Sequence, residues 1–252
     1  MRHPVSDIAS NPEILDRTVD QTIHPADQMY TGNSQHYFGC GRDAIRKISA
    51  TLVLTGCTEP ASVLDFACGY GRVTRYLRAA FPDAGVVSSD LMAAAVEYNA
   101  QTFGVTGHHS TPDLEDVTFD TAFDLIWCGS LMTHLPEEKA VRLLDVFERN
   151  LSDNGVAVFT THGRFVAERR HKPGWPYKID EETYQAIGER FDNGDYAYAD
   201  YAHAKGYGIS LTPQAWVARH LHGRKGLRCV FFMERGWDDH QDVCALIKKP
   251  IV

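Results

Sequence analysis

The residues best suited to chemistry lie in one loop, VLDFACGYGR, at positions 63–72. An apolar run leads into Asp65, and small residues then carry the chain through Gly69 and Gly71. Glycines allow a backbone to approach a ligand closely, because no Cβ stands in the way. A carboxylate aimed at such a loop repels a pyrophosphate and favours a ligand with positive charge. The loop therefore predicts a site for a cationic small molecule.

This loop does not match the two common phosphate-binding motifs. A P-loop requires G-x-x-x-x-G-K-[ST], which the chain lacks, and a dinucleotide fingerprint requires G-x-G-x-x-G. From Gly69 the chain reads G-Y-G-R-V-T, so Thr74 occupies the place of the third glycine. Thr74 is thus the feature that weighs against a nicotinamide-dependent dehydrogenase, which stays an alternative.

Strand and helix patterns alternate around the loop. Nearly continuous apolar runs predict strands at 62–67, 85–90, about 105–109, 123–129 and 156–161. Helical spacing of apolar residues predicts helices at 39–55, 72–81, 91–104 and 136–151, and SDNG at 152–155 predicts a turn. This alternation indicates a parallel sheet, whose ligands bind beyond the carboxyl ends of the strands.

The rhythm breaks at 163–211, a stretch rich in tyrosine, glycine and charge. A helix is predicted at 212–221 with Thr212 as N-cap and Pro213 at the first helical position, followed by an antiparallel hairpin of strands at 228–234 and 242–249. The expected fold is a Rossmann-like, mainly parallel seven-stranded sheet with helices on both faces and this hairpin at one edge. Residues 1–252 form one domain: an N-terminal cap (1–58), a ligand-binding core (59–162), a lid (163–211) and a C-terminal helix and hairpin (212–252).

These features resemble the class I S-adenosylmethionine (SAM)-dependent methyltransferases that act on small molecules. The first motif of that family is an apolar strand, an acid and G-x-G-x-G; here it reads LDFACGYG, with Ala67 replacing the first glycine. Asp90, at the end of VVSSD, fits the family's second acid. The resemblance spans roughly residues 60–162 and 210–250, and it implies SAM as cofactor and S-adenosylhomocysteine (SAH) as product.

The resemblance also implies roles for individual residues. Asp65 and the loop 67–71 would hold the amino-acid end of SAM, and Asp90 would accept hydrogen bonds from both ribose hydroxyls. Tyr30 and Tyr37 would close over the methionine end, although positions in the core explain them equally well. The residues expected to bind SAM are Asp65, Ala67, Cys68, Gly69, Gly71, Arg72, Asp90, Leu91, Met92, Asp113, Leu114, Gly129, Ser130, Tyr30 and Tyr37.

Two histidines follow strands that should open on the ligand crevice, His134 in SLMTHL and His162 in TTHGR. A hydroxyl acceptor must lose a proton during methylation, and histidine is the usual proton acceptor near neutral pH. Either histidine is a candidate general base, with His162 slightly favoured, and either could instead bond only to backbone. The lid tyrosines and Trp175 suit a polar ring such as a sugar, but packing against the sheet is the better explanation for any one of them.

Composition limits the expected partners. The 252 residues carry 33 acidic and 25 basic side chains, a formal charge of −8, which disfavours binding to nucleic acid or an anionic membrane. The six cysteines lack C-x-x-C spacing and are expected to be free, buried thiols of a cytoplasmic protein without a metal. We expect oxygen methylation of a sugar-derived or natural-product acceptor. A small-molecule N-methyltransferase and a non-catalytic SAM-binding regulator stay open, as does a homodimer.

Overall fold

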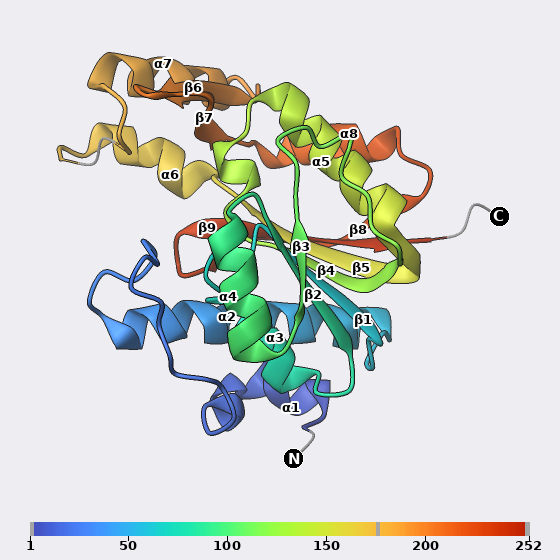
Figure 1. The fold of residues 1–252 in the computed structure, drawn as a ribbon. Helices are drawn as coiled ribbons and strands as arrows, with labels where there is room; N and C mark the ends of the chain where they lie inside the picture. Colours follow the sequence, from blue (N-terminus) through green and yellow to red (C-terminus); the bar gives the residue numbers. More distant parts are fainter. Residues whose placement is uncertain (1–2, 175–176, 250–252) are drawn as a thin grey trace.

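The computed structural model describes residues 3–174 and 177–249 and confirms the predicted α/β fold. Seven strands form a single sheet in the order β3-β2-β1-β4-β5-β9-β8 (Figure 1). Their bounds are β1 (Ser62–Phe66), β2 (Gly85–Asp90), β3 (Thr106–His109), β4 (Phe123–Cys128), β5 (Leu151–Thr161), β8 (Leu227–Trp237) and β9 (Gln241–Lys248). The first five run parallel, so the carboxyl ends of β1 and β2 lie side by side at one edge.

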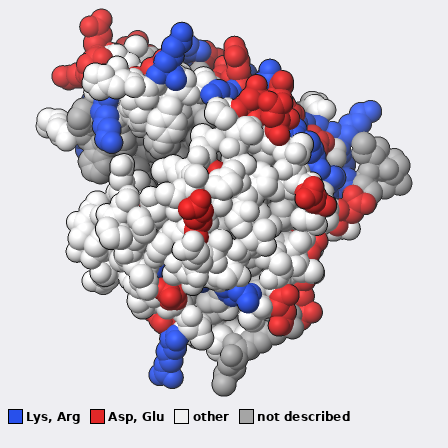
Figure 2. All heavy atoms as spheres, viewed as in Figure 1, with Lys and Arg blue, Asp and Glu red and all other residues white. Residues whose placement is uncertain are grey.

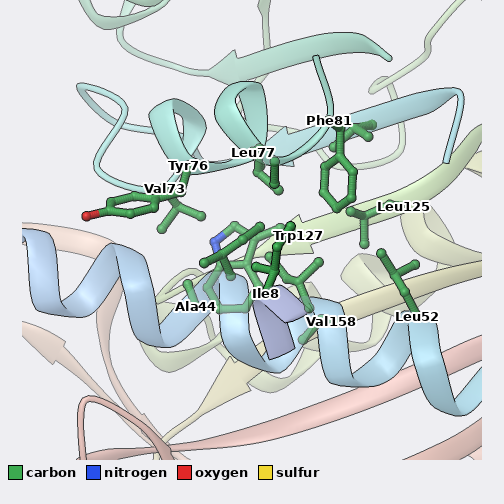
Figure 3. Packing of buried hydrophobic residues seen from close by; sticks show 14 of the residues in the cluster. Ile8, Ala44, Leu52, Val73, Tyr76, Leu77, Phe81, Leu125, Trp127 and Val158 are labelled. Carbon is green, nitrogen blue, oxygen red and sulfur yellow. The ribbon is translucent and has the colours of Figure 1, made fainter. Parts of the chain in front are cut away.

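Helices cover both faces of this sheet (Figure 1). On one face lie α2 (Ser34–Thr55), α3 (Thr74–Ala80) and α4 (Ala93–Phe103); on the other lie α5 (Glu137–Asn150) and α8 (Gln214–His222). Figure 3 shows Trp127 of β4 enclosed between the sheet and the helices of the first face. β1 is buried from Val63 to Phe66, as expected for a parallel strand covered on both sides.

The predicted C-terminal hairpin is present, with a shorter turn than the sequence indicated. β9 pairs antiparallel with both β5 and β8, and only Asp238–His240 connects β8 to β9. Asp238 and Asp239 adopt left-handed backbone angles, with φ of 54° and 49°. These angles allow a tight reversal, so the strands extend further than their apolar runs.

Two local predictions were wrong. The SDNG segment was predicted as a turn but lies inside β5, because β5 already pairs with Phe123 of β4 at Leu151. The pairing shifts register between Phe123 and Leu125, and Asn154 has a left-handed φ of 64°. Pro213, not Thr212, is the N-cap of α8. The Thr212 amide instead donates to the His162 carbonyl at 2.7 Å, which holds Thr212 against the end of β5.

The segment predicted as a lid forms a separate layer above the carboxyl ends of the strands (Figure 1). It contains α6 (Arg164–Glu168), a 3₁₀ turn η3 (Arg169–His171), α7 (Glu181–Asp192) and a small sheet of β6 (Ala197–Tyr201) and β7 (Ala204–Leu211). Asp180 caps α7 by accepting a hydrogen bond from the Thr183 amide at 2.8 Å. Ile187, Ile209 and Leu211 belong to a hydrophobic cluster of the lid's own, so this layer is more than a surface loop.

The N-terminal segment wraps under the first face, with α1 (Val5–Ser10) and the 3₁₀ turn η1 (Pro12–Leu15) against α2. Arg75 of α3, only 2% exposed, anchors this segment. Its guanidinium donates to the carbonyls of Asp20 and Thr22 at 2.9 and 2.8 Å and to that of Gly71 at 2.9 Å. One buried side chain therefore joins the N-terminal segment to the glycine loop.

Arg75→Met is expected to lower the free energy of unfolding by about 3 kcal/mol. Three carbonyls lose their donor, and each unsatisfied buried group costs about 1–3 kcal/mol. Arg78→Met, a change on the same helix at a half-buried position, serves as the matched control. Denaturant unfolding measures the free energy of unfolding of both variants, provided that their m-values equal that of the unmodified protein. A loss below about 1 kcal/mol in Arg75→Met would show that the anchor does not hold the segment.

Acidic and basic side chains are intermixed on the face shown in Figure 2, and much of its centre is uncharged. The six cysteines are free, but Cys229 is exposed rather than buried, because it lies on the edge strand β8. Within the described part of the chain, no helix combines the length and the apolar character needed to cross a membrane.

Candidate active site

The glycine loop and the second acid form one structural unit at the carboxyl ends of β1 and β2. The amides of Ala67 and Cys68 donate to the Ser89 carbonyl at 2.8 and 3.1 Å, which continues the pairing of the two strands into the loop. One carboxylate oxygen of Asp90 accepts from the Gly69 amide at 2.8 Å, and the other accepts from the Met92 amide at 2.9 Å. Asp90 therefore sets the shape of the loop.

Two positions in the loop have opposite surroundings. At Gly71, with φ 79°, an added Cβ would lie 2.4 Å from Asn99 Oδ1 and from the Phe103 ring, so only glycine fits against α4. At Gly69, with φ 51°, an added Cβ would meet no atom of the described residues within 4 Å. Open space thus faces the backbone at Gly69, where a ligand can approach.

Ala67, the departure from the family motif, has a left-handed φ of 65°. An alanine in this region costs roughly 1–2 kcal/mol relative to right-handed backbone. The fold tolerates this cost because the Ala67 amide is bonded to β2. The structure thus keeps the backbone path that a glycine would give at this position.

Asp65 lies beneath the loop rather than on its open side. Its side chain is 2% exposed and accepts a 2.6 Å hydrogen bond from the Thr74 hydroxyl. Burial raises the pKa of Asp65 to about 7, and the Thr74 hydroxyl acts in the opposite direction. Thr74, at the place of the third dinucleotide glycine, thus fixes this carboxyl. Its contact with the amino-acid end of SAM stays a prediction.

Several other expected SAM contacts follow the carboxyl ends of β2, β3 and β4, where the sequence predicts the cofactor crevice. Leu91 and Met92, directly after Asp90, are 59% and 49% exposed, so each offers apolar surface for a flat ring. Asp113 is exposed, and its carboxylate accepts from the Glu115 amide at 3.0 Å. Ser130, held at φ 60°, donates its amide to the Thr160 hydroxyl at 2.8 Å, next to Gly129.

Other expected contacts belong to the scaffold. Tyr37 is 1% exposed and donates its hydroxyl to Asp27 at 2.6 Å, while Tyr30 packs edge-on against its ring. Leu114 is buried in the core on the α5 face, and Cys68 is buried. The Arg72 guanidinium lies over the Trp237 ring at 5.1 Å. These residues shape the crevice from behind.

His134, on the 3₁₀ turn η2 (Met132–His134) after β4, lies under the lid. Its Nδ1 is 2.8 Å from the Gly208 carbonyl, which can only accept, so Nδ1 carries the proton. The Tyr201 hydroxyl is 3.1 Å from the same nitrogen. Nε2 therefore bears a lone pair, and burial lowers the pKa of His134 below 6.5. The Gly208 carbonyl thus orients the His134 ring and leaves Nε2 as its hydrogen-bond acceptor.

His162, at the end of β5, is 4% exposed and lies among other rings. Its ring centre is 6.3 Å from that of His134, 5.5 Å from His240 and 5.9 Å from Tyr177. Burial, followed by the charges of the two neighbouring histidines, lowers the pKa of His162 well below its usual value. Its Nδ1 is buried without a hydrogen-bond partner among the described residues. Trp175 lies outside the described residues.

Tyr207 of β7 connects this histidine cluster to the crevice. Its ring stacks on His134 with centres 4.8 Å apart and an angle of 29° between the planes. Burial raises the pKa of Tyr207, and the negative charge of Asp90 raises it further, so its hydroxyl lies within the field of that carboxylate. The lid therefore joins His134 to a tyrosine whose hydroxyl is influenced by the charge of Asp90.

Comparisons with known proteins agree with this geometry. Residues 63–155 match the family model described as a methyltransferase domain. This segment is therefore similar to that family, and the fold of the chain is that of SAM-dependent methyltransferases. The chain is 24% identical over 136 residues to a malonyl-[acyl-carrier protein] O-methyltransferase of Acetivibrio thermocellus. That alignment covers 52% of this chain and 47% of the relative, so the match spans about half of that protein's length.

Solved structures of methyltransferases share the fold of this chain. A SAM-dependent methyltransferase of Clostridium acetobutylicum superposes with a TM-score of 0.59 at 13% identity, over 85% of this chain and 92% of that one. The plantazolicin methyltransferase BpumL, solved with SAH and a substrate analogue, gives 0.58 at 14% identity over 98% and 95%. The N-methyltransferase NodS of Bradyrhizobium japonicum, solved with SAH, gives 0.53 at 14% identity over 94% and 98%.

The residues around the glycine loop and Asp90 fit SAM, whose product SAH is bound in two of these similar structures. An ionised carboxylate has about four acceptor positions, and backbone amides occupy one on each oxygen of Asp90, which leaves room for two ribose hydroxyls. Exposed Leu91 and Met92 suit an adenine ring, and the open space at Gly69 admits the chain of the methionine part.

Three residues that contact the candidate site were missed by the sequence analysis. His24 stacks on Tyr70 of the loop, with ring centres 4.4 Å apart. Asn99 donates to the Gly69 carbonyl at 2.9 Å from a fully buried position, which its place on the apolar stripe of α4 could have revealed. Gln241 donates to the Ser130 hydroxyl at 2.8 Å. His24 and Gln241 carry no sequence signal, because each is far along the chain from the site.

Proposed function

We propose that this protein transfers the methyl group of SAM to a hydroxyl oxygen of a small polar acceptor bound beneath the lid. The observation that carries the proposal is the stacking of Tyr207 on His134, because the charge of Asp90 also raises the pKa of this tyrosine and so links the expected cofactor site to the histidine cluster. Neutral imidazole groups in that cluster fit a reaction that releases a proton.

His134 is the proposed proton acceptor. SAM supplies an electrophilic methyl group when bound, so the chain must align the acceptor with it and take up the proton. The Gly208 carbonyl fixes the His134 tautomer and leaves the Nε2 lone pair for the acceptor hydroxyl. His162 is more deeply buried and has a pKa much further below neutrality, so it makes the weaker base. Its role is to line the pocket.

The lid supports a polar, ring-shaped acceptor such as a sugar-derived or natural-product scaffold. Tyr177, Tyr201 and Tyr207 contribute flat faces with hydroxyl groups, and each makes a ring contact with His134 or His162. Aromatic faces with polar tips suit molecules that carry both apolar ring faces and hydroxyl groups. The lid also covers the site and keeps bulk water from the acceptor.

Two other functions are less well supported. A nicotinamide-dependent dehydrogenase needs room for a pyrophosphate, but Thr74 is committed to Asp65 directly under the loop. A non-catalytic SAM-binding regulator gives no reason for an oriented, neutral His134 beside the crevice. Methylation of a neutral amine needs no general base from the enzyme. The presence of His134 therefore does not distinguish oxygen from nitrogen acceptors, and a kinetic test is needed.

The pH dependence of kcat/KM separates oxygen from nitrogen acceptors. For a hydroxyl acceptor, the rate is expected to rise as His134 loses its proton and to become constant above about pH 6.5, because burial places its pKa below that value. For an amine acceptor, the rate would keep rising to about pH 8 or beyond as the ammonium group deprotonates. Mass spectrometry of a panel of polyols, glycosides and amines with labelled SAM identifies the acceptors to be tested. A rise that continues past pH 8 with every accepted substrate would contradict oxygen methylation.

A further inference from the structure

A second cluster of ligand-type side chains lies away from the crevice, where the turn between β8 and β9 meets α2. His36 and Cys40 are four residues apart on α2, so their side chains leave the same face of the helix. Asp238 approaches both from the turn. In the part of the chain that the structure describes, these three side chains form the group whose ligand atoms lie close enough to share a metal ion.

The separations match those between ligands of one small metal ion. His36 Nε2 lies 2.9 and 3.1 Å from the two carboxylate oxygens of Asp238 and 3.6 Å from Cys40 Sγ. All three ligand atoms lie within 4.8 Å of one another. Bonds of about 2.0 Å to nitrogen and oxygen and 2.3 Å to sulfur, in tetrahedral geometry, place neighbouring ligand atoms about 3.3–3.6 Å apart. Only small side-chain movements separate the cluster from that arrangement.

Two hydrogen bonds hold Cys40 and Asp238 in place independently of any ion. The Trp237 indole donates to the Cys40 carbonyl at 2.8 Å, and the Asp238 amide donates to Asp43 at 2.8 Å. The Lys47 ammonium is paired with the Asp43 carboxylate, with Nζ and Oδ1 2.9 Å apart. Lys47 is therefore engaged and does not compete with a metal ion for the Asp238 carboxylate. The positions of the ligand-bearing backbones are therefore preset.

We propose that His36, Cys40 and Asp238 bind one zinc ion, with water as the fourth ligand. The combination of thiolate, imidazole and carboxylate suits zinc, whereas magnesium and calcium prefer oxygen ligands alone. A thiolate and a carboxylate together balance the charge of a divalent ion. The His36 and Asp238 side chains are 50% and 36% exposed, so water and the incoming ion reach the site, while Cys40 is buried behind them.

This ion acts as a clasp between α2 and the C-terminal hairpin. The clasped turn carries His240, which packs against His162, and it leads into Gln241, which bonds to Ser130. Holding the turn on α2 thus steadies one wall of the acceptor pocket. The zinc does not touch the cofactor crevice, so this site is separate from the methyl-transfer chemistry.

Metal analysis of the full-length protein tests the proposal. Protein stripped with a chelator, incubated with zinc chloride and dialysed is expected to retain one zinc per chain. Cobalt in its place should give the sulfur-to-cobalt charge-transfer band that a thiolate ligand produces. Cys40→Ser should lose this band, and His36→Gln and Asp238→Asn should weaken zinc binding at least about tenfold. Zinc should raise the thermal midpoint of the unmodified protein but not of these variants.

Cys57→Ser and His240→Gln are the matched controls. Cys57 is a half-buried thiol elsewhere, and His240 belongs to the other histidine cluster. Both variants should keep the zinc and the cobalt band. Because His36 and Asp238 are exposed, their variants fold even if Cys40→Ser does not. The proposal is overturned if stripped protein takes up no zinc, or if His240→Gln loses the ion while His36→Gln and Asp238→Asn keep it.

Discussion

His134→Ala is expected to lower kcat about 10²- to 10⁴-fold while leaving the Kd for SAM unchanged, the usual range for loss of a general base. The imidazole lies under the lid, held by the Gly208 carbonyl, and it does not bond to the loop 67–71 or to Asp90. The substitution therefore removes the proton acceptor without disturbing the cofactor crevice. Steady-state kinetics and calorimetry with SAH measure the two quantities separately.

The pH profile distinguishes loss of a base from loss of packing. In His134→Ala the fall in kcat/KM at low pH should disappear, whereas a merely structural change would lower the rate equally at all pH values. His222→Ala, at an exposed position at the end of α8, should leave both the rate and the profile unchanged. An unaltered kcat in His134→Ala, or an equal loss of SAM affinity, would remove His134 from its proposed role.

Asp90→Ala is expected to raise the Kd for SAM by about 10²- to 10⁴-fold. Hydrogen bonds to a charged group contribute about 1.5–3 kcal/mol each, and two ribose hydroxyls lose such a bond. The amides of Gly69 and Met92 also lose their acceptor, so the loop that faces the cofactor is less ordered. Calorimetric titration with SAM and SAH checks the expected loss.

Asp90→Asn and Asp120→Ala provide the comparison. Asparagine keeps one acceptor oxygen but no charge, so its effect should be intermediate. Asp120 is exposed and outside the crevice, and its loss should change neither affinity nor the thermal midpoint. Unchanged SAM affinity in Asp90→Ala would show that the ribose is held elsewhere.

The order of strands and helices could be predicted from the sequence because the apolar patterns are local. Apolar runs such as VLDF and VVSSD form the parallel strands β1 and β2. Helices of 7 to 14 residues, such as α3 and α5, connect successive strands. Two local predictions were wrong because contacts between distant segments determine the structure there. Asn154 lies in β5 because β4 pairs across it, and Thr212 is drawn to the His162 carbonyl rather than to the start of α8.

The candidate site was only partly accessible to sequence reasoning. Asp90, Gly69 and Gly71 follow from a motif with fixed spacing, and the structure brings them together. The difference between a ligand contact and a scaffold residue depends on burial, which the motif does not specify. Thus Asp65 and Tyr37 are buried partners of Thr74 and Asp27.

Contacts between distant parts of the chain could not be predicted at all. His240 reaches His162 and Asp238 reaches His36 only because the turn after β8 folds over α2 and the end of β5. No periodicity links residues separated by 78 or 202 positions. The lid tyrosines were singled out by residue type alone, and Tyr207 gains its place beside His134 from the pairing of β7 with β6.

The central claim is that the SAM crevice and the histidine cluster form one active site. A crystal structure of the complex with SAH tests it most directly. We predict that the ribose hydroxyls bond to Asp90 and that the sulfur faces the stacked rings of Tyr207 and His134. The claim would be contradicted if the sulfur opened onto a different face, away from both His134 and His162.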